Sequence, residues 1–152
     1  MSAKAIEKDV IIKRINGIQQ EIAELESMNS LSFDEFKNGD AYKLAHYHLH
    51  RALEGVFNIS SHILSRIPGG EATQYREIAE KLGEFGIVDK EFATQKLIPM
   101  AKYRNRLVHF YAEITEKELY DIIKNDLSDF GMFLSAIKKV LESPEQFNLT
   151  VE

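Results

Sequence analysis

The sequence predicts an all-α fold, a single-domain antiparallel bundle of about five helices over residues 1–152. Apolar residues recur at steps of three and four along most of the chain, which is the period of an amphipathic helix. Only three prolines and eight glycines interrupt the sequence, so few points break regular structure. No segment shows a convincing strand pattern, and the short connections between the expected helices favour antiparallel neighbours.

The first helix is expected from about Lys4 to Met28. One of its faces carries an apolar seam, made by Ile11, Ile15, Ile18, Ile22 and Leu25. A loop follows this helix. Ser32 is then placed to cap a short turn through Asp34 and Glu35, because a serine oxygen accepts bonds from the first backbone N–H groups of a helix.

Two further helices are expected between Gly39 and Glu84. The first of them runs to about Ile67 and ends at the breakers Pro68, Gly69 and Gly70. Its apolar face carries Ala45, Leu49, Leu53, Val56, Ser60 and Ile63. The second is shorter, begins near Thr73, and carries the stripe Tyr75, Ile78, Ala79 and Leu82.

The fourth helix is expected to follow Asp89, a good N-cap residue, and to continue to about Ala112. Pro99 lies inside this pattern. A proline in a helix interior removes one backbone donor, and its ring clashes with the carbonyl four residues earlier, here that of Gln95. The sequence therefore predicts a kink at this point.

The last helix is expected to start at a capping box and to run to about Leu141. Thr115 and Glu118 fit the T-x-x-E pattern, in which two side chains exchange bonds with otherwise unpaired backbone donors. The apolar stripe that follows is continuous: Leu119, Ile123, Leu127, Phe130, Leu134 and Ile137. The residues after Pro144 are expected to fray.

The composition excludes several classes of protein. The absence of cysteine excludes a disulfide framework and a thiolate metal site, and it points to a reducing compartment. No apolar run reaches the roughly 18 residues of a membrane-spanning helix, and the first residues lack a hydrophobic signal segment. A cytoplasmic protein without a membrane partner is therefore expected. The net charge of −5 argues against extended binding to a nucleic-acid backbone, but it leaves room for a small phosphate site.

One stretch departs from this acidic balance. No Asp or Glu occurs from Phe92 to Ala112, whereas four basic residues do: Lys96, Lys102, Arg104 and Arg106. One interpretation is a local anion site. The alternative is a helix face whose cations pair with acids elsewhere in the fold.

The run from Tyr103 to Tyr111 offers the groups that RNA cleavage without a metal needs. Imidazole, here His109, exchanges a proton near neutral pH and can act on the 2′-hydroxyl or the leaving oxygen. Guanidinium, here Arg104, is a permanently charged fork that fits phosphate oxygens. The amide of Asn105 can orient either group, and the phenol of Tyr111 can bond a phosphate or stack on a base.

Ideal helix geometry separates two of these groups. Asn105 and His109 would share one face and Arg104 and Tyr111 another, while Arg104 and His109 would lie about 140° apart. Either the helix is distorted near Pro99, or a second copy of the chain contributes to the cleft. The second option predicts a two-fold homodimer with this helix near the axis.

The pattern R-N-x-x-x-H-x-Y, filled by Arg104, Asn105, His109 and Tyr111, resembles the signature of HepT-like proteins in the HEPN superfamily. The resemblance covers roughly residues 11–141. Beyond the motif, residues 51–53 and 62–64 resemble the second helix of the family. Residues 74–77 and 86–89 resemble its short helix and the turn that follows it.

The resemblance implies an HEPN-like, commonly dimeric toxin of a type II/VII-like toxin–antitoxin pair, cleaving RNA without a metal or another cofactor. His109 would be the general acid or base, Arg104 would stabilise the transition state, and Asn105 would orient the pair. Lys102 and Arg106 are candidate phosphate contacts. The implied partner is a minimal nucleotidyltransferase, the MNT antitoxin. It can transfer AMP to the motif tyrosine, here Tyr111, which also contacts substrate.

Two other functions remain open. One is a non-catalytic helical interaction module that binds a nucleotidyltransferase and accepts AMP at Tyr111. The other is a structural helical dimer, in which Arg104 and His109 would be buried in mutual bonds. A metal site is not expected: His46 and His50 would share a helix face, but no third ligand is evident, and ordinary polar positions are favoured.

Overall fold

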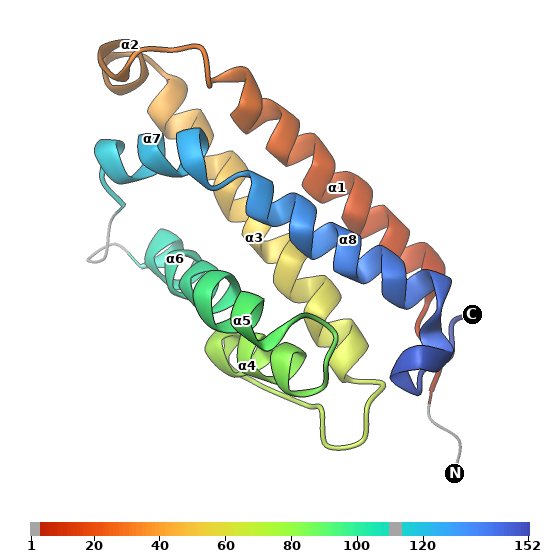
Figure 1. The fold of residues 1–152 in the computed structure, drawn as a ribbon. Helices are drawn as coiled ribbons and strands as arrows, with labels where there is room; N and C mark the ends of the chain where they lie inside the picture. Colours follow the sequence, from red (N-terminus) through yellow and green to blue (C-terminus); the bar gives the residue numbers. More distant parts are fainter. Residues whose placement is uncertain (1–3, 110–113) are drawn as a thin grey trace.

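The computed structural model of the chain describes residues 4–109 and 114–152, and its all-α architecture confirms the predicted fold class (Figure 1). Among the described residues, the only β-type pairing is an isolated bridge between Ile6 and Val151. The α-helices are α1 (Lys8–Ser27), α2 (Phe33–Asn38), α3 (Ala41–Leu64), α4 (Tyr75–Glu84), α5 (Lys90–Phe92), α6 (Ile98–Val108), α7 (Glu116–Asn125) and α8 (Ser128–Glu142).

Helix α3 lies at the centre of the bundle and contacts α1, α2, α4, α6 and α7. It runs antiparallel to both α1 and α6 (Figure 1). The approach of α1 is close: a Cβ atom built on Gly55 would lie 2.6 Å from Cγ1 of Ile18, so a side chain at this position would push the helices apart. The core therefore surrounds α3, and the helices that flank it are positioned by its buried faces.

Two of the three predicted N-caps form capping boxes, whereas Asp89 lies at the N-cap position of α5 and its side chain makes no capping hydrogen bond. The hydroxyl of Ser32 accepts the backbone N–H of Glu35, whose carboxylate accepts the N–H of Ser32 in return, and this capping box starts α2. Thr115 and Glu118 form the second capping box at the start of α7. These two local patterns were sufficient to place both helix starts.

The expected last helix is in fact two helices. α7 ends at Asn125, and α8 begins at Ser128. At the break the N–H of Asp126 donates to the carbonyl of Ile122 over 2.8 Å, and the N–H of Asp129 donates to the carbonyl of Asp126 over 3.1 Å. The second bond joins residues three apart, as in a 3₁₀ turn, so the helical turn is narrower there and the chain changes direction. The apolar stripe continues through the break, which is why the sequence pattern did not reveal it.

The distortion expected at Pro99 is a π-helical turn over Ala93–Leu97, directly before α6. The N–H of Ile98 donates to the carbonyl of Ala93, five residues earlier. This wider turn shifts the backbone register by one residue just before the proline, which has no N–H to donate. Pro99 then occupies the first turn of α6, where a missing N–H costs nothing.

The predictions for the two ends of the chain were wrong. Residues 4–7, expected in the first helix, are not helical, and the residues after Pro144 are not frayed. The N–H of Ile6 donates to the carbonyl of Thr150 over 2.8 Å, and the N–H of Glu152 donates to the carbonyl of Ile6 over 2.9 Å. Ile6 is fully buried, so this contact seals one end of the core.

Candidate active site

The guanidinium of Arg104, on α6, is held by three neighbours. Its Nε donates to a carboxylate oxygen of Glu54 on α3 over 2.6 Å. Its plane lies over the ring of Tyr75, with Cζ 4.0 Å from the ring centroid. Its Nη1 is 3.4 Å from the side-chain oxygen of Asn105. The charged fork is therefore oriented before any ligand arrives.

Glu54 is a residue of the candidate site that the sequence did not reveal. Besides Arg104, its carboxylate lies 3.4 Å from Nε2 of His50, one helical turn earlier on α3. The hydroxyl of Tyr75 lies 3.5 Å from its other oxygen, at the outer limit of a hydrogen bond. Burial, followed by the charge of Glu54, raises the pKa of the Tyr75 phenol, which keeps this group a donor. The carboxylate of Glu54 therefore contacts an imidazole, a phenol and the motif arginine.

The structure corrects the geometry expected for His109. Helix α6 ends at Val108, whereas the sequence pattern continued it to Ala112. His109 is in an extended conformation, with φ −114° and ψ 120°, and its side chain is exposed. It therefore does not share a helix face with Asn105. The rotation of about 140° calculated for an ideal helix also does not apply.

The exposure of His109 also bears on one alternative function. A purely structural dimer would have Arg104 and His109 buried in mutual bonds. Instead, Arg104 bonds Glu54, and His109, the residue that follows α6, is exposed. Tyr111 lies outside the described residues.

Arg106 makes a forked ion pair with Glu118. Its Nη1 and Nη2 donate to the two carboxylate oxygens over 2.7 Å and 2.9 Å. This bond, reinforced by the capping contacts of Thr115, lowers the pKa of Glu118 to about 2. The pair joins the last turn of α6 to the first turn of α7, and so it ties together the two helices on either side of residues 109–115.

The two interpretations of the basic stretch can now be compared. Three of its cations pair with acids from other helices: Lys96 lies 3.6 Å from Asp129, while Arg104 and Arg106 pair with Glu54 and Glu118. Lys102 is exposed and makes no ion pair with a described residue. The pairing explanation therefore holds for most of the stretch. Two groups could still bind an anion. They are the ammonium of Lys102 and the guanidinium donors of Arg104 that do not bond Glu54 or Asn105.

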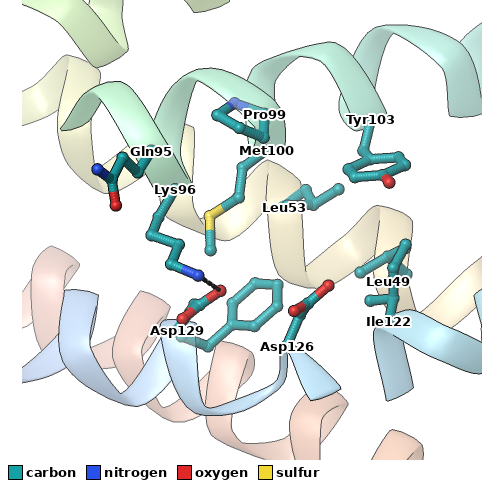
Figure 2. A pocket seen from close by; sticks show the side chains of 11 residues that line it. Leu49, Leu53, Gln95, Lys96, Pro99, Met100, Tyr103, Ile122, Asp126 and Asp129 are labelled. Carbon is teal, nitrogen blue, oxygen red and sulfur yellow. Dashed lines mark ion pairs between the residues drawn. The ribbon is translucent and has the colours of Figure 1, made fainter. Parts of the chain in front are cut away.

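A cavity of about 100 Å³ lies beneath α6 and is lined by the π-helical turn, α3, and the junction of α7 and α8 (Figure 2). Apolar side chains of Leu53, Met100 and Phe130 form much of its wall. Burial, and next the nearby charge of Asp129, raise the pKa of Asp126 at its edge. None of the motif residues Arg104, Asn105 and His109 lines this cavity, so it is separate from the candidate site.

The histidines of residues 46–50 point to different partners. His46 packs edge-on against Tyr42, His48 lies 2.6 Å from a carboxylate oxygen of Glu21, and His50 approaches Glu54. No group of three or more His, Cys, Asp or Glu side chains suited to a metal occurs within residues 4–109 and 114–152. In the same part of the chain, no helix combines the length and the apolar character needed to cross a membrane.

Comparison with known proteins adds independent evidence. A family profile described as "Ribonuclease HepT-like" matches residues 18–137. A protein described as tRNA nuclease HepT, from Aphanizomenon flos-aquae (strain 2012/KM1/D3), is 26% identical over 144 residues, which cover 94% of this chain and 97% of that protein.

Solved structures with similar folds come from toxin–antitoxin complexes. The tri-AMPylated HEPN toxin of Shewanella oneidensis, solved in complex with an MNT antitoxin, superposes with a TM-score of 0.78. A toxin–antitoxin complex with AMP-PNP gives a TM-score of 0.77. In both cases the identity is 23%, and the match covers 86% of this chain and 98% of the other. At this identity, the likeness establishes the shared fold.

Proposed function

This chain belongs to the ribonuclease HepT-like family, and from that premise we propose that it is the endoribonuclease toxin of a type II/VII-like toxin–antitoxin pair. One observation carries the proposal: the guanidinium of Arg104 is fixed by Glu54, Tyr75 and Asn105, five residues before an exposed histidine. A preoriented cation and a group that exchanges protons are the two components that phosphodiester cleavage without a metal requires.

The proposed reaction uses these side chains, the RNA and water. The 2′-oxygen attacks the adjacent phosphorus, a new P–O bond forms, and the bond to the 5′-oxygen of the next nucleotide breaks. His109 takes the 2′-hydroxyl proton or supplies the proton to the departing 5′-oxygen, and water carries out the other proton transfer. Arg104 donates N–H groups to the phosphoryl oxygens as their charge increases. The products are a 2′,3′-cyclic phosphate and a 5′-hydroxyl.

The remaining motif residues have supporting roles in this proposal. Asn105 orients Arg104 through their contact of 3.4 Å. Lys102 is exposed on α6 and is available to a flanking phosphate. The forked bond between Arg106 and Glu118 makes a positioning role the better assignment for Arg106. Transfer RNA is the first substrate to test, because the relative from Aphanizomenon is described as a tRNA nuclease.

We assign the partner as an MNT-type nucleotidyltransferase, as in the Shewanella complex. The acceptor would be Tyr111. Its phenol oxygen attacks the α-phosphorus of ATP, the bond to pyrophosphate breaks, and the phenol proton is lost. A bulky anion two residues after His109 would then repel and obstruct the phosphate of the RNA.

The test is cleavage of total tRNA by purified protein in EDTA. Wild type, Arg104→Ala and His109→Ala are compared, with Arg76→Ala as the matched arginine control, because Arg76 makes only an exposed pair with Glu80 on α4. Cleavage should fall by at least about a hundredfold when His109 or Arg104 is removed, and it should persist in the Arg76 variant. Products ending in a 2′,3′-cyclic phosphate are expected.

Two outcomes would contradict the proposal. If His109→Ala cleaves RNA at the wild-type rate, His109 has no part in the chemistry. If no protein cleaves RNA, and mass measurement shows that Tyr111 carries no AMP, the non-catalytic interaction module becomes the better explanation.

A further inference from the structure

A groove of about 460 Å³ lies between α1 and α3 and shares Glu54 with the Arg104 network. This volume lies in the range of about 300–1,000 Å³ that small-ligand sites occupy. Because Glu54 lines the groove and also bonds Arg104, the groove adjoins the candidate active site at this residue. Its other charged and aromatic lining residues include Lys13, Arg14, Tyr47, His50 and Arg51.

The charges of the groove favour an anionic ligand. Its two carboxylates are already engaged: Glu21 accepts bonds from Arg51 and His48, and Glu54 accepts from Arg104. Lys13 and Arg14 are exposed on α1, and neither has an ion-pair partner in the part of the chain that the structure describes. On a protein with a net charge of −5, these cations beside the candidate site are suited to phosphate groups.

An exposed aromatic ring lies at the same groove. Tyr47 is 55% exposed, which is unusual for a large aromatic residue on a central helix. The guanidinium carbon of Arg51 lies 5.4 Å from its ring centroid and supports one side of the ring. An exposed ring with neighbouring cations is the arrangement on which unpaired bases stack in proteins that bind single strands.

Gly17 gives a reason why the groove is open. It lies inside α1, where glycine weakens a helix relative to alanine, and a Cβ atom at this position would meet nothing within 4 Å. Gly55, across the groove, is explained by its close contact with Ile18, but packing does not explain Gly17. The missing side chain of Gly17 keeps the groove free.

We propose that this groove between α1 and α3 binds the single-stranded RNA that flanks the cleaved phosphate. One unstacked base lies on Tyr47, and neighbouring phosphates contact Lys13 and Arg14. The inference rests on the proposed ribonuclease function and adds to it the path by which the substrate enters. Single-stranded RNA is favoured over a duplex because one groove with one exposed ring fits splayed nucleotides.

The test measures RNA binding without cleavage. A short fluorescein-labelled single-stranded RNA is titrated with His109→Ala protein, and anisotropy gives the Kd. Into this background we introduce Gly17→Glu, which fills the groove, and Gly131→Glu as its control. Gly131 also lies in a helix, α8, and a Cβ atom there also meets nothing within 4 Å, but it does not line the groove. Both variants change the net charge equally, and both replace glycine with a better helix former.

We expect Gly17→Glu to weaken RNA binding by about tenfold or more relative to Gly131→Glu, while both variants unfold at or above the parent temperature. Tyr47→Ala should weaken binding by about tenfold, the loss of one stacked base. Equal binding by the two glutamate variants would overturn the inference. If RNA binding is equal but Gly17→Glu alone fails to bind a nucleotidyltransferase antitoxin, the groove is a protein interface instead.

The failure of this inference is distinguishable from the failure of the proposed function. A protein that cleaves and binds RNA, with Gly17→Glu matching Gly131→Glu, retains the function and loses only the groove. A protein that neither cleaves nor binds RNA overturns both.

Discussion

The carboxylate of Glu54 holds the motif arginine, and this contact can be tested with one substitution. Glu54→Gln keeps the size and one acceptor but removes the charge that fixes Nε of Arg104. We expect kcat for RNA cleavage to fall about ten- to a hundredfold, because a small displacement of a catalytic group has effects of this size. KM should not rise, since the loss of a negative charge beside the groove favours RNA.

Glu80→Gln is the matched control for this measurement, because Glu80 accepts a bond from Arg76 on the exposed surface of α4. Both variants should keep the wild-type melting temperature to within a few degrees, as partly exposed ion pairs contribute about 0–1 kcal/mol. A Glu54→Gln enzyme with unchanged kcat would show that the contact has no role in positioning Arg104.

Single residues also mark where sequence reasoning reached its limit at the site. The motif from Arg104 to Tyr111 was found because its members are neighbours in the sequence. Glu54 precedes Arg104 by 50 residues, and only the packing of α3 against α6 brings the two together. The sequence does show an acid, Glu54, four residues after His50 on a mostly apolar helix. This spacing does not indicate which residue Glu54 would contact.

At the scale of helices, the ion pair between Arg106 and Glu118 predicts a stability that depends on pH. The pKa of Glu118 is about 2 in the folded protein, below its ordinary value of 4.5. A carboxylate with a depressed folded pKa stabilises the fold fully above its unfolded pKa, and this stabilisation is lost as pH falls through the folded value. Wild type should therefore lose this contribution between about pH 4.5 and pH 2.

Glu118→Gln should lack this pH-dependent contribution. At pH 7 we expect it to be less stable by about 1 kcal/mol, the value of a partly exposed ion pair, because glutamine can still serve the capping box. This is about 2–4 °C in melting temperature for a domain of this size. The difference from wild type should shrink as the pH falls toward 2. Glu35→Gln removes the acid of the other capping box, which has no arginine partner, and serves as control. An equal loss in both variants would exclude a contribution from Arg106.

Helix starts were more predictable than helix ends in this chain. Ser32 and Thr115 predict the starts of α2 and α7 because a capping box is a local and chemically specific pattern. The end of α6 at Val108 has no glycine or proline signal, and the apolar pattern continues beyond it. The end of α6 is the boundary with the largest effect on the predicted site, because the expected longer helix included His109.

At the scale of the whole molecule, the proposed homodimer can be tested by mixing two inactive variants. If each cleft takes Arg104 from one chain and His109 from its partner, Arg104→Ala and His109→Ala proteins should complement each other after exchange of subunits. An equal mixture should recover roughly a quarter of the wild-type rate, because about half of the dimers are mixed and each has one intact cleft of two. No recovery, with exchange demonstrated by mass, would place each cleft within one chain.

The bridge between Ile6 and Val151 brings both ends of the described chain to the same place. Figure 1 shows the start of α1 and the C-terminus at the end of the bundle opposite α2 and α7. The described chain therefore begins and ends at neighbouring positions. An affinity tag, a surface tether or a fused reporter leaves the molecule on the same side from either end, away from the carboxyl end of α6. Immobilisation through either end would keep the carboxyl end of α6 facing the solution.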